Sequence, residues 1–128
     1  MVGPPERRQF PRAARVRTGP HIRTLLREGR RLRGRRVELF ALPSPTGRPR
    51  FGTVVPKHRH RIVDRNLVRR RLREIGRTEV LPLLEARGLA LDILVRAGPA
   101  AYSADHSDLL AELNRLMESL CSENLPSE

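Results

Sequence analysis

One segment of the chain, residues 61–77, constrains the fold more than any other. At roughly 100° per residue it forms an amphipathic helix. Its polar face carries a row of arginines widened by two neighbours, namely Arg65, Arg69, Arg73, Arg77, Asn66 and Arg70. Its apolar face carries Val68, Leu72 and Ile75. The pattern therefore predicts a helix that packs with one side and presents a row of guanidinium groups with the other.

The arginine row has two interpretations. A guanidinium group binds phosphate in a bidentate way, so the row suits a nucleic-acid backbone. The other interpretation is an ordinary solvated face, which usually mixes charges of both signs. Here we expect Glu74 to pair with Arg70, and Asp64 lies where a helix start favours an acid. We expect no acidic partner for the remaining arginines, which favours nucleic-acid binding.

The charge of the whole chain points the same way. Its 128 residues carry a net charge of +12, and Lys57 is the only lysine. Residues 1–77 hold 23 basic and 5 acidic side chains, a net charge of +18, whereas residues 78–128 have a net charge of −6. The basic part is therefore the expected binding surface.

The cellular compartment is inferred from features that the sequence lacks. The single cysteine, Cys121, excludes an internal disulfide and fits a reducing compartment. No apolar run approaches the length of a membrane span, and the basic N-terminal stretch has no apolar signal segment. We therefore expect a cytoplasmic protein with no membrane partner.

Apolar periodicity and turn residues predict the other elements. Further helices are expected from about residue 20 to 29, at 78–85 and at 105–120. Strands are expected at residues 36–42, 51–55 and 89–96, with residues 30–36 as a basic connector. Residues 1–14 are expected to be a flexible basic arm, and residues 121–128 a disordered tail. These elements alone suggest a sheet with helices packed on one face.

Three stretches together resemble a known family. The string Arg65-Asn66-x-x-Arg69-Arg70-x-x-Arg73-Glu74 resembles the RNR motif of the bacterial ribonuclease P protein subunit. Upstream, Gly52-x-Val54-Val55-x-Lys57 resembles the strand that leads into that motif, and residues 91–96 resemble the family's late strand. The likeness covers residues 15–120, which it marks as a single RNA-binding domain.

The resemblance implies a fold and an RNA-binding surface. The fold would be α+β, an αβββαβα sandwich with a mixed sheet, like the second domain of ribosomal protein S5. It would have a left-handed crossover at the RNR helix. The residues expected to bind RNA are Lys57, Arg61, Arg65, Asn66, Arg69, Arg70 and Arg73.

The resemblance also implies a cleft between the first helix and the sheet for the single-stranded 5′ leader of precursor tRNA. Its residues would be Ile22, Leu26 and Phe40. The family usually has two Phe on the first helix where this chain has Ile22 and Leu26. His60 and Asp64 also depart from the family pattern, which often has Gly and an apolar residue there. Ile22, Leu26 and Phe40 can equally be read as core residues.

The sequence shows no catalytic constellation. It contains no nucleophile elbow, phosphate-binding loop or zinc spacing, and the carboxylates of its basic part are isolated. The resemblance implies that an RNA subunit is the catalyst, with Mg²⁺ bound mainly by that RNA, and that precursor tRNA is the substrate. We therefore expect the non-catalytic protein component of an endoribonuclease, inactive alone, with no catalytic or metal-binding residues of its own. The alternatives are a small basic ribosomal or RNA-chaperone protein and a stand-alone ribonuclease that uses His58 or His60.

Overall fold

The computed structural model describes residues 12–16, 18–57 and 59–123. Most of the predicted N-terminal arm (residues 1–11), His58 and residues 124–128 lie outside these ranges. The helices are α1 (Gly19–Glu28), α2 (Ile62–Ile75), α3 (Leu81–Ala86) and α4 (His106–Glu123). The strands are β1 (Arg30–Arg33), β2 (Val37–Pro43), β3 (Arg50–Val54) and β4 (Leu91–Ala97). The remaining described elements are 3₁₀ turns at Arg12–Ala14 and Pro99–Ser103 and a π-helical turn at Gly76–Val80. Residues 12–14 of the predicted arm therefore form a turn.

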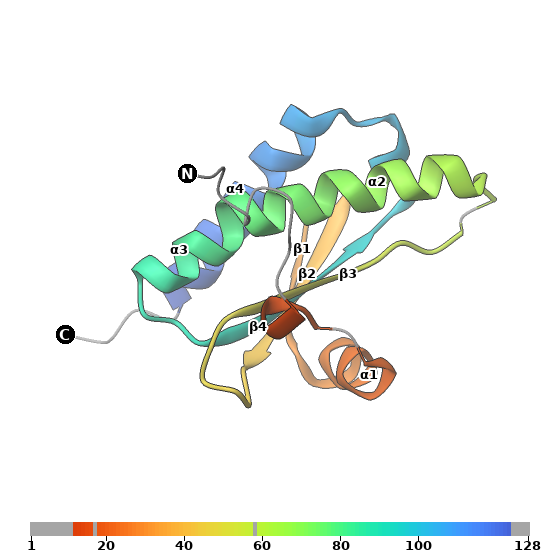
Figure 1. Cartoon of the computed structure of the whole chain (residues 1–128). Helices are drawn as coiled ribbons and strands as arrows, with labels where there is room; N and C mark the ends of the chain where they lie inside the picture. Colours follow the sequence, from red (N-terminus) through yellow and green to blue (C-terminus); the bar gives the residue numbers. More distant parts are fainter. Residues whose placement is uncertain (1–11, 17, 58, 124–128) are drawn as a thin grey trace, which may run out of the picture.

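The four strands form one mixed sheet in the order β1-β2-β4-β3. β2 pairs antiparallel with both β1 and β4, whereas β3 pairs parallel with β4. A parallel pair needs a crossover connection, and α2 and α3 supply it (Figure 1). The α+β class and the mixed sheet are therefore confirmed.

The expectation that all helices pack on one face is wrong. α1 lies on one side of the sheet, and α2 and α4 lie on the other (Figure 1). The cause is visible in β2, where Leu39 belongs to the large core under α2 and α4 and Phe40 belongs to a smaller core under α1. A strand with apolar residues on both sides requires a cover on both sides.

The predicted basic connector at residues 30–36 is also partly wrong, because Arg30–Arg33 form β1. Leu32 is buried and pairs with Leu39 of β2, while its arginine neighbours remain exposed. An edge strand that is three-quarters arginine gives almost no apolar alternation, so its sequence resembles a loop. Charged edge strands are one way in which proteins avoid pairing with other chains.

The helical backbone continues beyond the end of α2 at Ile75. α2 continues through a π-helical turn, Gly76–Val80, directly into α3. Gly76 has helical backbone angles, and a Cβ atom there would lie 2.3 Å from the Phe51 ring. This glycine therefore allows the helix to pack closely on β3, and it does not terminate the helix.

The last helix is longer than predicted. An Asp105–Asp108 capping box starts it: Asp105 Oδ1 accepts the Asp108 N–H at 2.9 Å, and Asp108 Oδ2 accepts the Asp105 N–H at 3.1 Å. α4 then runs to Glu123, so residues 121–123 are helical and do not belong to a tail. Cys121 is buried, and Glu123 accepts two hydrogen bonds from Arg30, at 2.8 and 2.7 Å. These contacts stabilise the extra turn.

Candidate nucleic-acid interface

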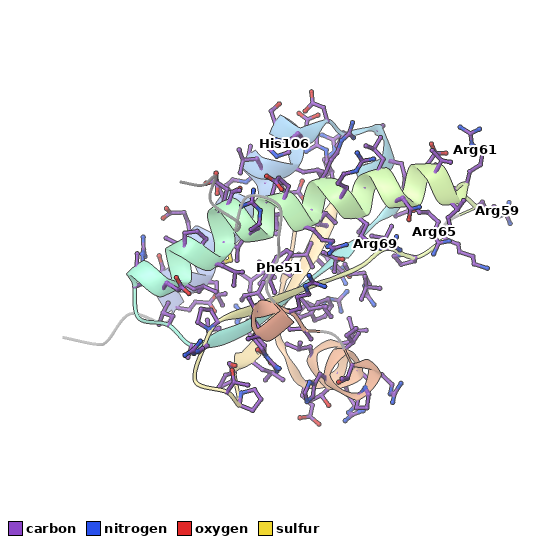
Figure 2. All side chains as sticks on the ribbon, in the orientation of Figure 1. Phe51, Arg59, Arg61, Arg65, Arg69 and His106 are labelled. Carbon is purple, nitrogen blue, oxygen red and sulfur yellow. The ribbon has the colours of Figure 1, made fainter. Side chains whose placement is uncertain are left out.

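The two faces of α2 are as the periodicity predicts. Val68, Leu72 and Ile75 are buried against the sheet. The predicted RNA-binding residues of the helix lie on its other sides, where Arg61, Asn66, Arg70 and Arg73 are exposed and Arg65 and Arg69 are half-buried. Figure 2 shows Arg59 and Arg61 extending beyond the N-terminal end of α2, with Arg65 and Arg69 along its lower side in that view. Lys57 is exposed on the segment that leads into the helix.

The acidic residues of α2 pair locally. Arg61 Nε lies 3.4 Å from Asp64 Oδ2, and Arg77 Nη2 lies 2.6 Å from Glu74 Oε2. The expected Glu74–Arg70 pair is therefore wrong, because Glu74 contacts Arg77 instead. Asn66 Oδ1 accepts a 2.6 Å hydrogen bond from Arg69 and so fixes that guanidinium group.

These pairs leave the middle of the arginine row with little neutralisation. Within the described ranges, Arg65, Arg69 and Arg70 form no ion pair with a carboxylate. Because close like charges repel, a row of this kind is suited to a polyanion.

An aromatic pair lies beside the start of α2. The rings of His60 and Tyr102 stack with centroids 3.6 Å apart and planes 4° apart. The Tyr102 hydroxyl donates a 2.9 Å hydrogen bond to the Pro56 carbonyl, and burial raises the pKa of that hydroxyl despite the nearby positive charges of Arg65 and Arg69. Sequence reasoning missed Tyr102. The only signal was that it is the one tyrosine in the chain and follows β4 in a turn.

Arg65 and Arg71 differ from the exposed arginines. Arg65 Nε is buried and has no hydrogen-bond partner among the described residues. Arg71 Nη1 donates a 2.7 Å hydrogen bond to the Ala104 carbonyl, so it ties α2 to the segment before α4. Among the arginines of α2, Arg71 therefore has a structural role, whereas the exposed ones face solvent.

The three predicted cleft residues come together between α1 and the sheet. Ile22 and Leu26 are partly buried and pack against a cluster that contains Phe40. Phe40 itself is only 2% exposed. In this structure it is a core residue, and an RNA base could reach its ring only if the surrounding side chains moved.

A second group of arginines surrounds Glu38 near Phe40. Glu38 accepts hydrogen bonds from Arg31, from Arg33 Nε at 3.2 Å and from Arg96 Nε at 3.0 Å. The guanidinium carbons of Arg96 and Arg31 lie 5.2 and 5.9 Å from the centre of the Phe40 ring. Burial raises the pKa of the Glu38 carboxyl, but the hydrogen bonds from Arg31 and Arg96 outweigh burial and lower it to about 2. We call Glu38 and these three arginines the Glu38 cluster.

Two further observations concern the described residues only. They contain no group of three or more His, Cys, Asp or Glu side chains that could hold a metal ion. None of the helices they form is both long enough and apolar enough to cross a membrane.

Comparisons with known proteins agree with this geometry. The family model described as Ribonuclease P matches residues 10–121. The ribonuclease P protein component of Acidothermus cellulolyticus is 38% identical over 112 residues, which cover 84% of this chain and 88% of that protein. The corresponding protein of Micrococcus luteus is 37% identical, covering 92% of this chain and 96% of the relative.

Solved structures show the same fold at lower identity. The ribonuclease P protein of Staphylococcus aureus superposes with a TM-score of 0.71 at 20% identity, covering 85% of this chain and 96% of that one. The protein of Thermotoga maritima gives a TM-score of 0.66 at 21% identity, covering 80% and 93%. With the family model matched across nearly the whole chain and relatives close to 40% identical, the chain belongs to the bacterial ribonuclease P protein family.

Proposed function

We propose how this chain acts in ribonuclease P, the endoribonuclease holoenzyme in which its family supplies the protein component for tRNA 5′ processing. The exposed side of α2 and its lead-in bind the catalytic RNA subunit, which holds the Mg²⁺ and cleaves the substrate. The observation that carries this proposal is the row of arginines with few carboxylate partners opposite the buried face of α2. The residues assigned to RNA binding are Lys57, Arg61, Arg65, Asn66, Arg69, Arg70 and Arg73.

The protein contributes by positioning charge. Because one rigid helix carries the guanidinium groups, their spacing is set before binding. Contact with successive phosphates therefore costs less conformational entropy. The Asn66–Arg69 hydrogen bond adds to this preorganisation. The holoenzyme should therefore assemble at lower Mg²⁺ than the RNA needs alone, because protein charge replaces some of the cations that the folded RNA attracts.

For precursor tRNA we propose that the 5′ leader passes along the sheet face beside α1. The rings that would stack on leader bases are absent at Ile22 and Leu26, and Phe40 is buried. Contacts with the leader would then come mainly from arginines, so precursor binding should be unusually sensitive to salt.

The remaining expectations belong to the same proposal. We infer that the β3–α2–α3–β4 crossover is left-handed, as in the second domain of ribosomal protein S5, on the basis of the family resemblance and the parallel β3–β4 pair. Residues 15–120 would act as a single RNA-binding domain. The site of action would be the cytoplasm.

The decisive experiment mixes purified protein, its cognate RNA subunit and precursor tRNA at low Mg²⁺. Leader removal should require both the protein and the RNA, and the protein alone should cleave nothing. Cleavage by the protein alone, abolished by His58→Ala or His60→Ala, would instead indicate a protein ribonuclease. RNA annealing without any effect on leader removal would indicate a chaperone.

A further inference from the structure

The turn between β1 and β2 forms part of a pocket of about 460 Å³. Its charged walls are Arg33, Arg35, Arg36, Glu38 and Arg96. Four guanidinium groups and one carboxylate thus surround one space, although the sequence suggested only a basic connector here. None of the residues assigned above to RNA binding lines this pocket.

A buried carboxylate holds the turn from below. Glu112 of α4 is fully buried and accepts the backbone N–H groups of Arg36 at 2.7 Å and Val37 at 2.9 Å. It also accepts a 3.2 Å hydrogen bond from the Arg36 guanidinium. A Cβ atom on Gly34 would lie 2.2 Å from Glu112 Oε2, so the close approach of the turn to this carboxylate requires glycine. The turn is therefore fixed before any ligand arrives.

The opposite wall is oriented by Glu38. This carboxylate binds Arg33 and Arg96 at once, which holds both guanidinium groups at the pocket. Arg35, by contrast, is exposed and forms no ion pair within the described part of the chain. The pocket therefore combines three oriented cations with one cation that has no carboxylate partner.

We propose that this pocket is a second phosphate-binding site, which takes the phosphodiester backbone of an RNA strand. Guanidinium groups held at fixed positions favour bidentate contacts with phosphate oxygens. Pro56 and Pro99 also line the space and offer apolar surface to a ribose or base. The proposal rests on the proposed function, because it takes the ligand to be an RNA of the ribonuclease P complex.

The pocket is connected to the α2 surface by direct contacts. Pro56 lines the pocket and accepts the hydrogen bond from Tyr102, whose ring stacks on His60. His60 directly precedes Arg61, the residue that caps α2. A strand held in the pocket would therefore leave it beside the start of the arginine row.

The test measures the binding of a fluorescent single-stranded RNA of about ten nucleotides to the full chain at several salt concentrations. The Arg33→Ala/Arg35→Ala variant removes two exposed pocket cations. Arg87→Ala/Arg115→Ala is the matched control, since it removes the same charge at exposed positions away from the pocket. Thermal unfolding of both variants checks that the fold is intact.

The pocket variant should flatten the slope of log affinity against log salt by about 0.7 for each phosphate that the protein no longer neutralises. The control should leave the slope nearly unchanged. Equal changes in the two variants would overturn the proposal, because net charge alone would then explain the binding.

The source of the strand is identified with larger RNAs. Weaker binding of precursor tRNA, with mature tRNA unaffected, would assign the pocket to the leader, and weaker binding of the RNA subunit would assign it to that RNA. If the pocket variant matches the control in every titration while leader removal still needs protein and RNA subunit together, the pocket proposal fails and the proposed function stands. If leader removal never depends on the protein, the proposed function fails, and the oligonucleotide titration still reports on the pocket.

Discussion

The arginines of α2 and those of the sheet are the same residue in two different settings. On α2 they pair with neighbours three positions away, as in Arg61–Asp64. In the sheet they pair with acids far away in sequence, as in Arg30–Glu123 and Arg50–Asp92. The Arg61 side chain is 80% exposed, whereas that of Arg50 is 10% exposed.

This difference separates two roles. An exposed arginine with a weak local partner adds little to stability and can exchange that partner for a phosphate. A buried arginine must keep its carboxylate, because a buried charge without a partner is strongly unfavourable. The buried Arg50 of the sheet therefore holds the fold, whereas the exposed arginines of α2 are available for binding.

The largest expected effect is at the buried pair. Arg50 donates two hydrogen bonds to Asp92, at 2.8 and 2.6 Å. Asp92→Ala leaves the guanidinium group buried alone and should cost about 3–5 kcal/mol of unfolding free energy. Urea unfolding measures this, and Arg50→Met/Asp92→Leu should regain much of the loss. A loss in the Asp92→Ala variant similar to that of a surface substitution would erase the distinction between the two groups of arginines.

The apolar side of α2 gives the next effect. Leu72 is fully buried, so Leu72→Ala should destabilise the fold by roughly 2–5 kcal/mol. The same urea titration measures it, with Arg70→Ala on the exposed side as the control. Comparable losses in both variants would mean that the polar side of α2 also contributes to the fold.

The Glu38 cluster predicts a pH dependence. The folded-state pKa of Glu38 is about 2, below its ordinary value of 4.5. Its contribution is therefore fully present above pH 4.5 and disappears as the pH falls toward 2. The decrease should be at most about 3 kcal/mol. Unfolding measured across this range should show a shallower acid dependence in Glu38→Gln, and an identical dependence would place the titrating group elsewhere.

Phe40 distinguishes a core residue from a binding residue. Because the ring is buried, Phe40→Leu should lower stability, by less than the roughly 3–5 kcal/mol of a Phe→Ala change, and should weaken precursor and mature tRNA binding equally or not at all. Thermal unfolding and paired binding titrations test this. Selective weakening of precursor binding at unchanged stability would show that the ring does stack on the leader.

The smallest effect on stability should come from the arginine row. Arg65→Ala, Arg69→Ala and Arg73→Ala should each change unfolding by no more than about 1 kcal/mol. Each should nevertheless weaken binding to the RNA subunit and flatten its salt slope by about 0.7–0.9 for every phosphate left without its guanidinium partner. An unchanged slope in the triple variant would contradict the assignment of this surface.

Sequence reasoning succeeded where the determining interactions are local. The spacing of Val68, Leu72 and Ile75 gave the buried side of α2, which the structure confirms. The π-helical turn at Gly76 was missed because the packing that favours it, against Phe51, lies far away in sequence.

The strand β1 was not predicted for the same reason, although its arginines were interpreted as part of a basic connector. Their strand is fixed by pairing with β2 and by acids such as Glu38 and Glu123, which no local pattern links to them. The position of α1 could not be predicted either, since a strand with two apolar sides does not specify which helix covers which side. Of the candidate site, the helix surface followed from periodicity, and the pocket at the β1–β2 turn did not.

The extra turn of α4 gives the protein a built-in chemical probe. Cys121 is the only cysteine in the chain, it is fully buried, and burial raises the pKa of its thiol. Since the thiolate is the reactive form, a thiol reagent can label it only when the end of α4 detaches from the core. The labelling rate therefore reports the opening of this end of the molecule without any engineered tag. Comparing the labelling rate with and without bound RNA would reveal whether RNA binding at the basic surface changes how often this end of α4 opens.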